Sequence, residues 1–133
     1  MPDTPVLLGW VIVYVDDPPA ARELYMRAFG LEGGFEAPGG TYAELGTGTT
    51  KLAFAAYSLG EANFTGGVRP ASLEGRPANV ELALVSEDVD GAYTRALDAG
   101  CTSLSAPADQ SHGQRVAWVR DPFGTLLELA TPL

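Results

Sequence analysis

The chain has 133 residues, of which 46% are hydrophobic and 19% are charged, and its formal net charge is −9. A chain of this size forms one ordinary domain whose core needs no disulfide or metal to hold it together. Nucleic-acid binders cluster Lys and Arg to neutralise phosphates, so the acidic balance and the scattered basic residues exclude that class. The acidic surface favours solubility and, weakly, a cationic partner.

The single cysteine and the absence of targeting signals favour the cytoplasm. Cys101 cannot form a disulfide within the chain, which suits a reducing compartment, and we interpret it as a small buried hydrophobe. The first ten residues lack the basic region of a signal peptide, and no apolar run approaches a membrane span. We therefore expect a cytoplasmic protein that contacts no membrane.

The first half of the sequence predicts a strand, a helix and further strands. Val and Ile enrich Leu7–Val15, which favours a strand. Asp17 stands before two prolines, and this pattern predicts a helix whose first N–H groups are capped by the carboxylate. Gly30 suits the end of that helix. Short strands are then expected at Tyr42–Leu45 and Lys51–Tyr57, with a weaker one near Gly34–Ala37.

The second half repeats this order. Asn79–Val85 predicts a strand, Asp88 caps a helix that ends at Gly100, and strands follow at Arg115–Arg120 and Thr125–Ala130. The sequence Asp121-Pro122-Phe123-Gly124 between these last strands predicts a type I turn. Asp17 and Asp88 align at an offset of 71 residues, which indicates an internal repeat.

We expect half-repeats at about 7–57 and 79–133 within a single domain that covers residues 1–133. They are joined by residues 58–78, which we call the connector. It is rich in Gly, Pro and Asn, and long loops of this kind are often lids or interface arms. The sequence leaves open whether it is a ligand lid, a dimer arm or a plain link.

Two stretches resemble a known family. GWVIVYVDDPPAARELYMRAFGLE (residues 9–32) and the pair ELALVSEDVDGAYTRALDAG and GQRVAWVRDPFGTLLELATP (within residues 81–132) are similar to the two halves of a vicinal oxygen chelate protein, of the glyoxalase/bleomycin-resistance/dioxygenase superfamily. The resemblance implies an α+β fold of two βαβββ repeats, which form a cupped mixed sheet around a ligand cleft, often in a homodimer. Members include metal-dependent lyases, isomerases and dioxygenases, and metal-free proteins that sequester antibiotics.

The resemblance also implies where a metal would bind. Metal-dependent members place one ligand on the first and one on the last strand of each half. These positions fall on Trp10, near Leu52, on Glu81 and on Glu128. Only the two glutamates can ligate an ion, and the only histidine, His112, falls in a predicted loop outside this pattern. We expect no metal and no cofactor; if an ion binds, Glu81 and Glu128 would hold it.

The two glutamates allow several interpretations. Strand alternation turns Glu81 and Glu128 toward the cup, where they could hold Mg²⁺ or Mn²⁺, bind a cation or perform acid–base work. Two close carboxylates repel, so one pKa should be raised. Alternatively, Glu128 pairs with Arg115 or Arg120 across strands. His112 is expected to be a surface residue, or a functional residue at the cleft rim.

Aromatic residues complete the predicted site. Trp10 and Tyr14 should lie on the cup face of the first strand, joined by Tyr42, Phe54 and Trp118. Such rings can line an apolar ligand pocket and attract cations, or can simply fill the cup. No Gly-rich phosphate loop and no Gly-x-Ser-x-Gly elbow is present.

The sequence thus favours a metal-free small-molecule-binding protein similar to the bleomycin-resistance branch, with a role in antibiotic resistance. Its ligand would be aromatic or cationic, held by Trp10, Tyr14, Tyr42, Phe54, Glu81, Trp118 and Glu128. The alternative is a divalent-metal-dependent lyase, isomerase or dioxygenase-like enzyme with a degenerate ligand set. A third possibility is a dimeric interaction module without an open cleft.

Overall fold

The computed structural model describes residues 2–133 and divides into two compact units. Unit 1 runs to Met26 and resumes over Gly30–Val68, and unit 2 comprises Arg27–Phe29 and Arg69–Leu133. In chain order the elements are β1 (Trp10–Val15), α1 (Pro18–Phe29), β2 (Gly33–Glu36), η1 (Pro38–Gly40), β3 (Tyr42–Leu45), β4 (Lys51–Ala56), α2 (Tyr57–Asn63), β5 (Glu81–Val85), α3 (Val89–Asp98), β6 (Thr102–Asp109), β7 (Arg115–Arg120) and β8 (Leu126–Ala130).

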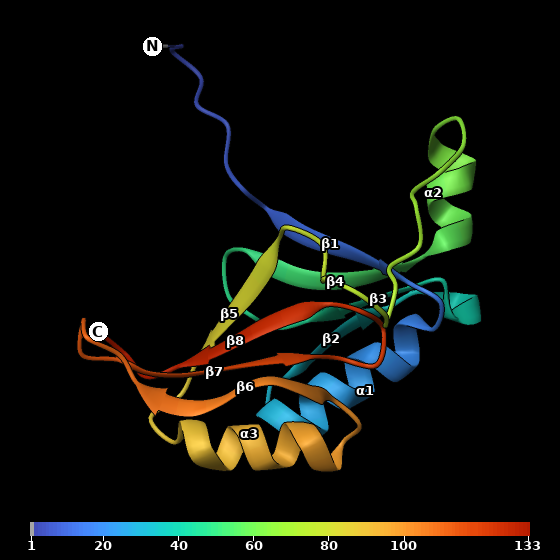
Figure 1. The fold of residues 1–133 in the computed structure, drawn as a ribbon. Coiled ribbons are helices and arrows are strands. Elements are labelled where there is room, and N and C mark those ends of the chain that lie inside the picture. Colours follow the sequence, from blue (N-terminus) through green and yellow to red (C-terminus); the bar gives the residue numbers. More distant parts are fainter. Residues whose placement is uncertain (1) are drawn as a thin grey trace. The chain divides into compact units, whose positions relative to one another are not determined.

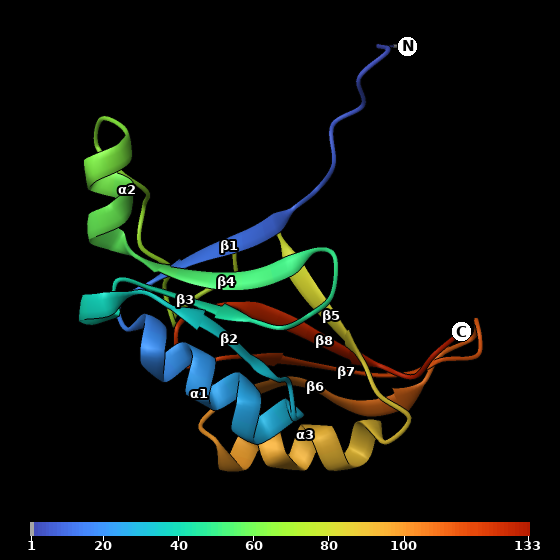
Figure 2. The ribbon, with the colours of Figure 1, turned by 180° about the vertical axis from the view of Figure 1, so that it is seen from behind.

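Each unit is built around one four-stranded mixed sheet, in the order β1-β4-β3-β2 or β5-β8-β7-β6 (Figures 1 and 2). The first strand of each half lies parallel to the last, and the remaining pairs are antiparallel. The predicted α+β fold of two βαβββ repeats is therefore confirmed. Among the described residues, no helix is both long and apolar enough to cross a membrane.

Both long helices begin as the sequence predicts. The Asp17 carboxylate accepts a hydrogen bond from the Ala20 N–H at 3.2 Å, and Asp88 accepts one from the Gly91 N–H at 2.9 Å. These side chains satisfy N–H groups that a helix start leaves without partners. Gly30 ends α1 in the left-handed region at φ 69°, a conformation that Gly adopts without steric penalty.

The helices define the two faces of each sheet. In unit 1, Tyr25 of α1 packs on Phe54 of β4 with ring centroids 5.0 Å apart, and both side chains are buried. In unit 2, α3 residues Val89 and Ala92 pack with Ala117 and Leu129. We call the opposite face of each sheet, which the helix does not cover, its ligand face.

The cysteine lies in the core of unit 2, as predicted. Cys101 is buried with 6% of its surface exposed. Burial raises the pKa of its thiol to about 12, and the negative charge of Asp121 adds to this shift. The thiol is protonated at neutral pH and is therefore a poor nucleophile.

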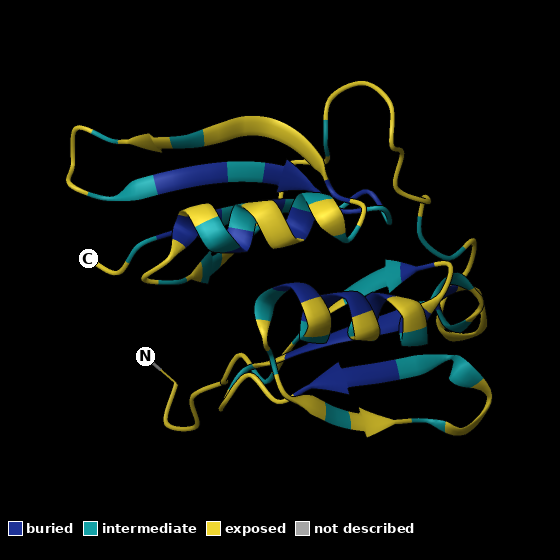
Figure 3. Cartoon of the chain, turned by 90° about the horizontal axis from the view of Figure 1, so that it is seen from below, coloured by how far each residue is buried: buried dark blue, intermediate teal, exposed yellow. Residues whose placement is uncertain are grey.

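Three predictions about elements were wrong. Residues 57–63 form α2, although the sequence analysis placed a strand end at Tyr57 and a loop from Ser58. Val80, which the predicted strand Asn79–Val85 includes, precedes β5 and is 67% exposed. The strand β6 was not recognised because it is mostly exposed and lacks a clear apolar alternation, in contrast to the buried β7 beside it (Figure 3).

Candidate functional site

The ligand face of unit 1 carries a carboxylate with three polar partners. Glu44 of β3 accepts a hydrogen bond from the Trp10 indole at 2.8 Å and from the Tyr42 hydroxyl at 2.6 Å. Lys51 Nζ lies 3.7 Å from its second oxygen. Only 8% of Glu44 is exposed, so the carboxylate is buried but well satisfied.

These contacts shift two pKa values in opposite directions. The hydrogen bond from Tyr42 lowers the pKa of Glu44, helped by Trp10 and Lys51 and opposed by burial. Burial raises the pKa of Tyr42 to about 12, and the hydrogen bond and charge of Glu44 raise it further. Glu44 is therefore an anion and Tyr42 a neutral donor at neutral pH.

The Trp10 indole reaches Glu44 across the middle strand. Trp10 is on β1 and Glu44 is on β3, with β4 between them. The residue of β4 beside Glu44 is Ala53, whose side chain is small and fully buried. Trp10 as a whole remains 52% exposed, and its indole N–H is hydrogen-bonded to the Glu44 anion.

The ligand face of unit 2 carries a second indole–carboxylate pair. The Trp118 indole of β7 donates to Glu81 of β5 at 3.3 Å, again across a middle strand, β8. Glu128 of β8 lies directly beside Trp118 in the antiparallel register. Strand register therefore brings together three predicted site residues from three neighbouring strands.

The charged form of Glu128 is disfavoured by its surroundings. Burial raises its pKa, and the charge of Glu81 and hydrogen bonding to Glu81 raise it further, while His112 opposes the shift. The predicted raised pKa of one carboxylate is thus borne out. His112 is close enough to act on Glu128, and its ring nitrogen lies 2.6 Å from the Gln114 side-chain oxygen.

Within residues 2–133, Glu128 forms no ion pair with either arginine that the sequence suggested. Arg115 instead bridges Asp90 at 3.0 Å and Asp109 at 3.1 Å. Arg120 donates to the backbone oxygens of Leu73 and Gly75.

Two expectations about the ligand faces need correction. Phe54 does not lie on the ligand face, because strand alternation turns its ring toward α1, where it contacts Tyr25 and is fully buried. The register also moves the first-half counterpart of Glu128 from Leu52 to Ala53, because Ile12 pairs with Ala53 just as Ala83 pairs with Glu128. An alanine cannot ligate a metal.

Tyr14 has a different environment from Trp10. The helix α2 contacts β1 and β4. Gly60 of α2 is so close to Tyr14 that a Cβ atom added to Gly60 would lie 3.2 Å from the ring. The helix, which the sequence analysis missed, therefore packs on this ring at one end of the ligand face.

The residues do not fit a metal centre. Among residues 2–133, no three His, Cys, Asp or Glu side chains gather where they could hold a metal ion. Of the four family ligand positions, Trp10 and Ala53 offer no metal-binding atom, which leaves only the carboxylates of Glu81 and Glu128. Two carboxylates alone are a sparse set for a tightly held ion.

A cavity of about 230 Å³ in unit 2 lies apart from the predicted site residues; it is lined by Arg27, Ala28, Arg95, Asp98 and Ala99. None of the aromatic or acidic residues discussed above contributes to its walls.

The residue missed by sequence reasoning is Glu44. It stands two positions after Tyr42 on a short strand, so alternation alone places both on one face. The resemblance directed attention to the first and last strands of each half, whereas Glu44 lies on the strand between β2 and β4.

Comparison with known proteins agrees with this architecture. The solved glyoxalase/bleomycin resistance protein/dioxygenase family enzyme from Burkholderia phytofirmans is 23% identical with a TM-score of 0.77, over 95% of this chain and 98% of that chain. TioX from Micromonospora sp. ML1 is 25% identical with a TM-score of 0.69, over 93% of this chain and 97% of that chain.

A curated relative from Mycobacterium bovis, described as an uncharacterized protein, is 42% identical over 64 residues. The match covers 48% of this chain and 41% of that protein, less than half of its length. The family model of the Glyoxalase/Bleomycin resistance protein/Dioxygenase superfamily matches residues 7–129. The chain, with its paired βαβββ units and a match over nearly its full length, belongs to this superfamily.

Proposed function

We propose that this protein binds a small aromatic cation without a metal. The observation that supports this most directly is the Trp118–Glu81–Glu128 group, in which an indole and two carboxylates share one face. A cation near Glu128 would stabilise its charged form, which burial and Glu81 disfavour. The indole would add aromatic contact and cation–π attraction.

Unit 1 offers a weaker site for the same ligand class. Glu44 is already neutralised by three donors, so it has little remaining attraction for a cation. Trp10 still presents a half-exposed ring. We infer that unit 2 by itself carries the stronger site for a cation and that unit 1 by itself offers mainly aromatic surface.

The biological role that we propose is sequestration, as in antibiotic resistance by metal-free members of the family, in the cytoplasm. Stoichiometric binding without turnover needs no catalytic group. The net charge of −9 would attract a cationic drug in a salt-dependent manner.

We also propose that the protein is a homodimer. Both β1 and β5 are edge strands, and they carry exposed apolar residues, with Ile12 44% exposed and Val85 65% exposed. Val6 and Leu7, just before β1, are 95% and 89% exposed. Unpaired apolar edges invite association, so light scattering should give about twice the monomer mass of 13.9 kDa.

The test of binding uses proflavine, a planar aromatic cation, in equilibrium dialysis at low and moderate salt. The anionic aromatic 8-anilinonaphthalene-1-sulfonate is the control for nonspecific apolar binding. We expect proflavine to bind, and the Glu81→Gln variant to bind it roughly tenfold more weakly, as loss of a charged contact implies. Equal affinity of the wild type for both dyes, or equal affinity of wild type and Glu81→Gln for proflavine, would refute cation recognition at Glu81.

The metal-dependent alternative is tested in parallel. The protein is incubated with Mg²⁺, Mn²⁺, Fe²⁺, Ni²⁺ or Zn²⁺, dialysed exhaustively and examined by elemental mass spectrometry. We expect no stoichiometric ion. A retained ion that disappears in both Glu81→Gln and Glu128→Gln variants would replace the binding proposal with an enzymatic one.

A further inference from the structure

The part of the connector that belongs to unit 2 is attached to that unit by a buried arginine. Arg120, at the end of β7, donates from its two terminal nitrogens to the Leu73 oxygen at 2.8 Å and the Gly75 oxygen at 2.9 Å. Only 5% of Arg120 is exposed, whereas Leu73 and Gly75, the residues that it holds, are themselves exposed. We call residues 71–75 the strap.

A second contact holds the strap at its other end. Gly124, in the turn between β7 and β8, has φ +97°, and a Cβ atom added there would lie 2.7 Å from Ala71 Cβ and 3.1 Å from the Ser72 oxygen. Only glycine permits so close an approach in this conformation. Ser72 also accepts from the Glu74 N–H at 3.0 Å, which folds the strap on itself.

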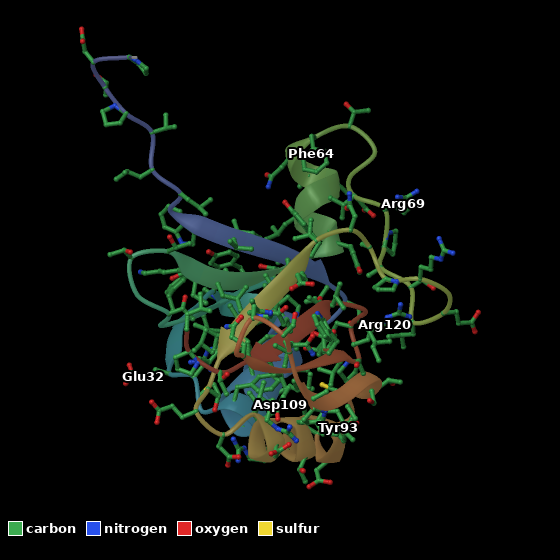
Figure 4. The ribbon with its side chains drawn as sticks, turned by 60° about the vertical axis from the view of Figure 1, so that its left-hand side comes forward. Glu32, Phe64, Arg69, Tyr93, Asp109 and Arg120 are labelled. Atoms are coloured by element: carbon green, nitrogen blue, oxygen red, sulfur yellow. The ribbon has the colours of Figure 1, made fainter. Side chains whose placement is uncertain are left out.

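The arginine that holds the strap shares a face with the proposed site. Arg120 pairs with Leu126 of β8, and Leu126 pairs with Glu81 of β5, so these three residues form one row across the sheet. The adjacent row contains Val119 and Leu127, and the row after it, which projects to the same side as the first, contains Trp118 and Glu128. By strand alternation the side chain of Arg120 therefore leaves the sheet on the same side as Trp118 and Glu81. Figure 4 shows Arg120 beneath the connector that follows Arg69.

We propose that Arg120 is a positioning residue that latches the strap onto unit 2 as a wall of its ligand face. This extends the function proposed above, since the wall would contact the same ligand that Trp118 and Glu81 hold. Ligand binding and strap closure would then be coupled. A ligand that binds more tightly when the strap is closed also raises the population of the closed strap by the same factor.

The first experiment measures the latch without a ligand. Glutamyl endopeptidase cleaves after Glu74, and cleavage within a folded segment requires that segment to detach. Both arginines of the connector precede proline, so trypsin, which cleaves poorly before proline, should leave wild type and variants intact there. We expect Arg120→Met to be cleaved after Glu74 about tenfold faster than wild type, with Arg120→Lys in between, as the loss of two charged hydrogen bonds implies.

A strap-side variant guards against general unfolding. Ser72→Ala removes both hydrogen bonds between the Ser72 hydroxyl and the Glu74 backbone, and it leaves Arg120 and the ligand face intact. It should also be cleaved faster after Glu74, while its thermal unfolding midpoint stays within a few degrees of wild type. Equal cleavage of wild type, Arg120→Met and Ser72→Ala would overturn the latch.

The second experiment measures coupling to the ligand face. Saturating proflavine should slow cleavage after Glu74 several-fold in wild type, and Arg120→Met should bind proflavine several-fold more weakly. If proflavine binds but leaves cleavage unchanged, the strap is not a wall of the site. If proflavine fails to bind wild type, the function proposed above fails, and with it the wall, while the cleavage rates still decide the latch.

Discussion

The two ligand faces use the same pair of residues in opposite order. In unit 1, Trp10 is on the edge strand β1 and Glu44 is on β3, two strands away. In unit 2 the types are exchanged: Glu81 is on the edge strand β5 and Trp118 is on β7, two strands away. The repeat offset and the strand registers make Trp10 the counterpart of Glu81, and Glu44 the counterpart of Trp118.

The difference between the pairs lies in what surrounds each carboxylate. Glu44 has three polar partners and a lowered pKa, so the fold of unit 1 itself stabilises the charged carboxylate. In unit 2 a second carboxylate, Glu128, stands where unit 1 has Ala53, and its pKa is raised. A polar group that is satisfied by its own fold stabilises the protein, whereas one that is not satisfied remains available to a ligand.

The largest expected effect comes from removing the satisfied carboxylate. Glu44→Ala should lower the free energy of unfolding by about 3 kcal/mol, because it leaves the Trp10 and Tyr42 donors without their acceptor. The counterpart change Glu81→Ala, at an exposed position, should alter it by about 0.5 kcal/mol or less. Urea unfolding measures both, and similar losses would mean that the two pairs are energetically alike.

The next effect isolates one hydrogen bond. Tyr42→Phe removes only the hydroxyl that donates to Glu44 at 2.6 Å, and it should cost about 1.5 kcal/mol, as expected for a bond to a charged group. The matched control is Tyr93→Phe, which removes an exposed hydroxyl that donates to the neutral Ser103 hydroxyl at 2.7 Å and should cost less. A Tyr42→Phe variant as stable as wild type would show that the Trp10 and Lys51 contacts suffice.

A smaller effect of opposite sign is expected in unit 2. Glu128→Gln should increase the free energy of unfolding by up to about 1 kcal/mol at pH 7, because it removes a half-buried charge beside Glu81. Since the pKa of Glu128 is higher in the folded than in the unfolded state, the gain should be absent below the unfolded pKa and grow as pH rises through the folded one.

The pH dependence of Glu44 should run the other way. The folded pKa of Glu44 lies below its ordinary value of 4.5, so its stabilising contribution is present above that value and is lost as pH falls through the folded pKa. Thermal unfolding midpoints of Glu44→Gln and Glu128→Gln are measured between pH 3 and 8. Glu44→Gln should be less stable than wild type at neutral pH, Glu128→Gln should be more stable, and both differences should shrink as the pH falls. Parallel curves across this range would contradict both assignments.

The smallest effect tests the longer hydrogen bond. Trp118→Phe removes the 3.3 Å contact to Glu81 and should cost about 0.5 kcal/mol or less beyond its lost packing, whereas Trp10→Phe removes the 2.8 Å contact to a buried acceptor and should cost more. Urea unfolding of the two single variants measures both losses of unfolding free energy. A larger loss for Trp118→Phe than for Trp10→Phe would contradict the expectation.

Local sequence signals predicted most of the fold because they act over a few residues. Asp17 and Asp88 cap their helices as expected, and the repeat offset gave both units. The same signals missed β6, whose exposed edge needs no apolar alternation, and α2, whose Gly60 is a poor helix former held against Tyr14.

The candidate site was harder to predict because it depends on register. Trp10, Glu81, Trp118 and Glu128 could be placed on the correct face by alternation, but Phe54 was placed on the wrong one because the count along β4 was one residue out. Glu44 and the Arg120 contact join residues 34 and more than 40 positions apart, which no local pattern reveals.

The position of the two tryptophans has a practical consequence. The chain has two of them, one in each unit, and each is bonded through its indole N–H to a carboxylate. A variant that keeps only one of them has a single intrinsic fluorophore, so its emission reports on one half of the chain alone. Recording both variants during denaturation would show whether the halves melt as one cooperative body or in sequence, without any attached label.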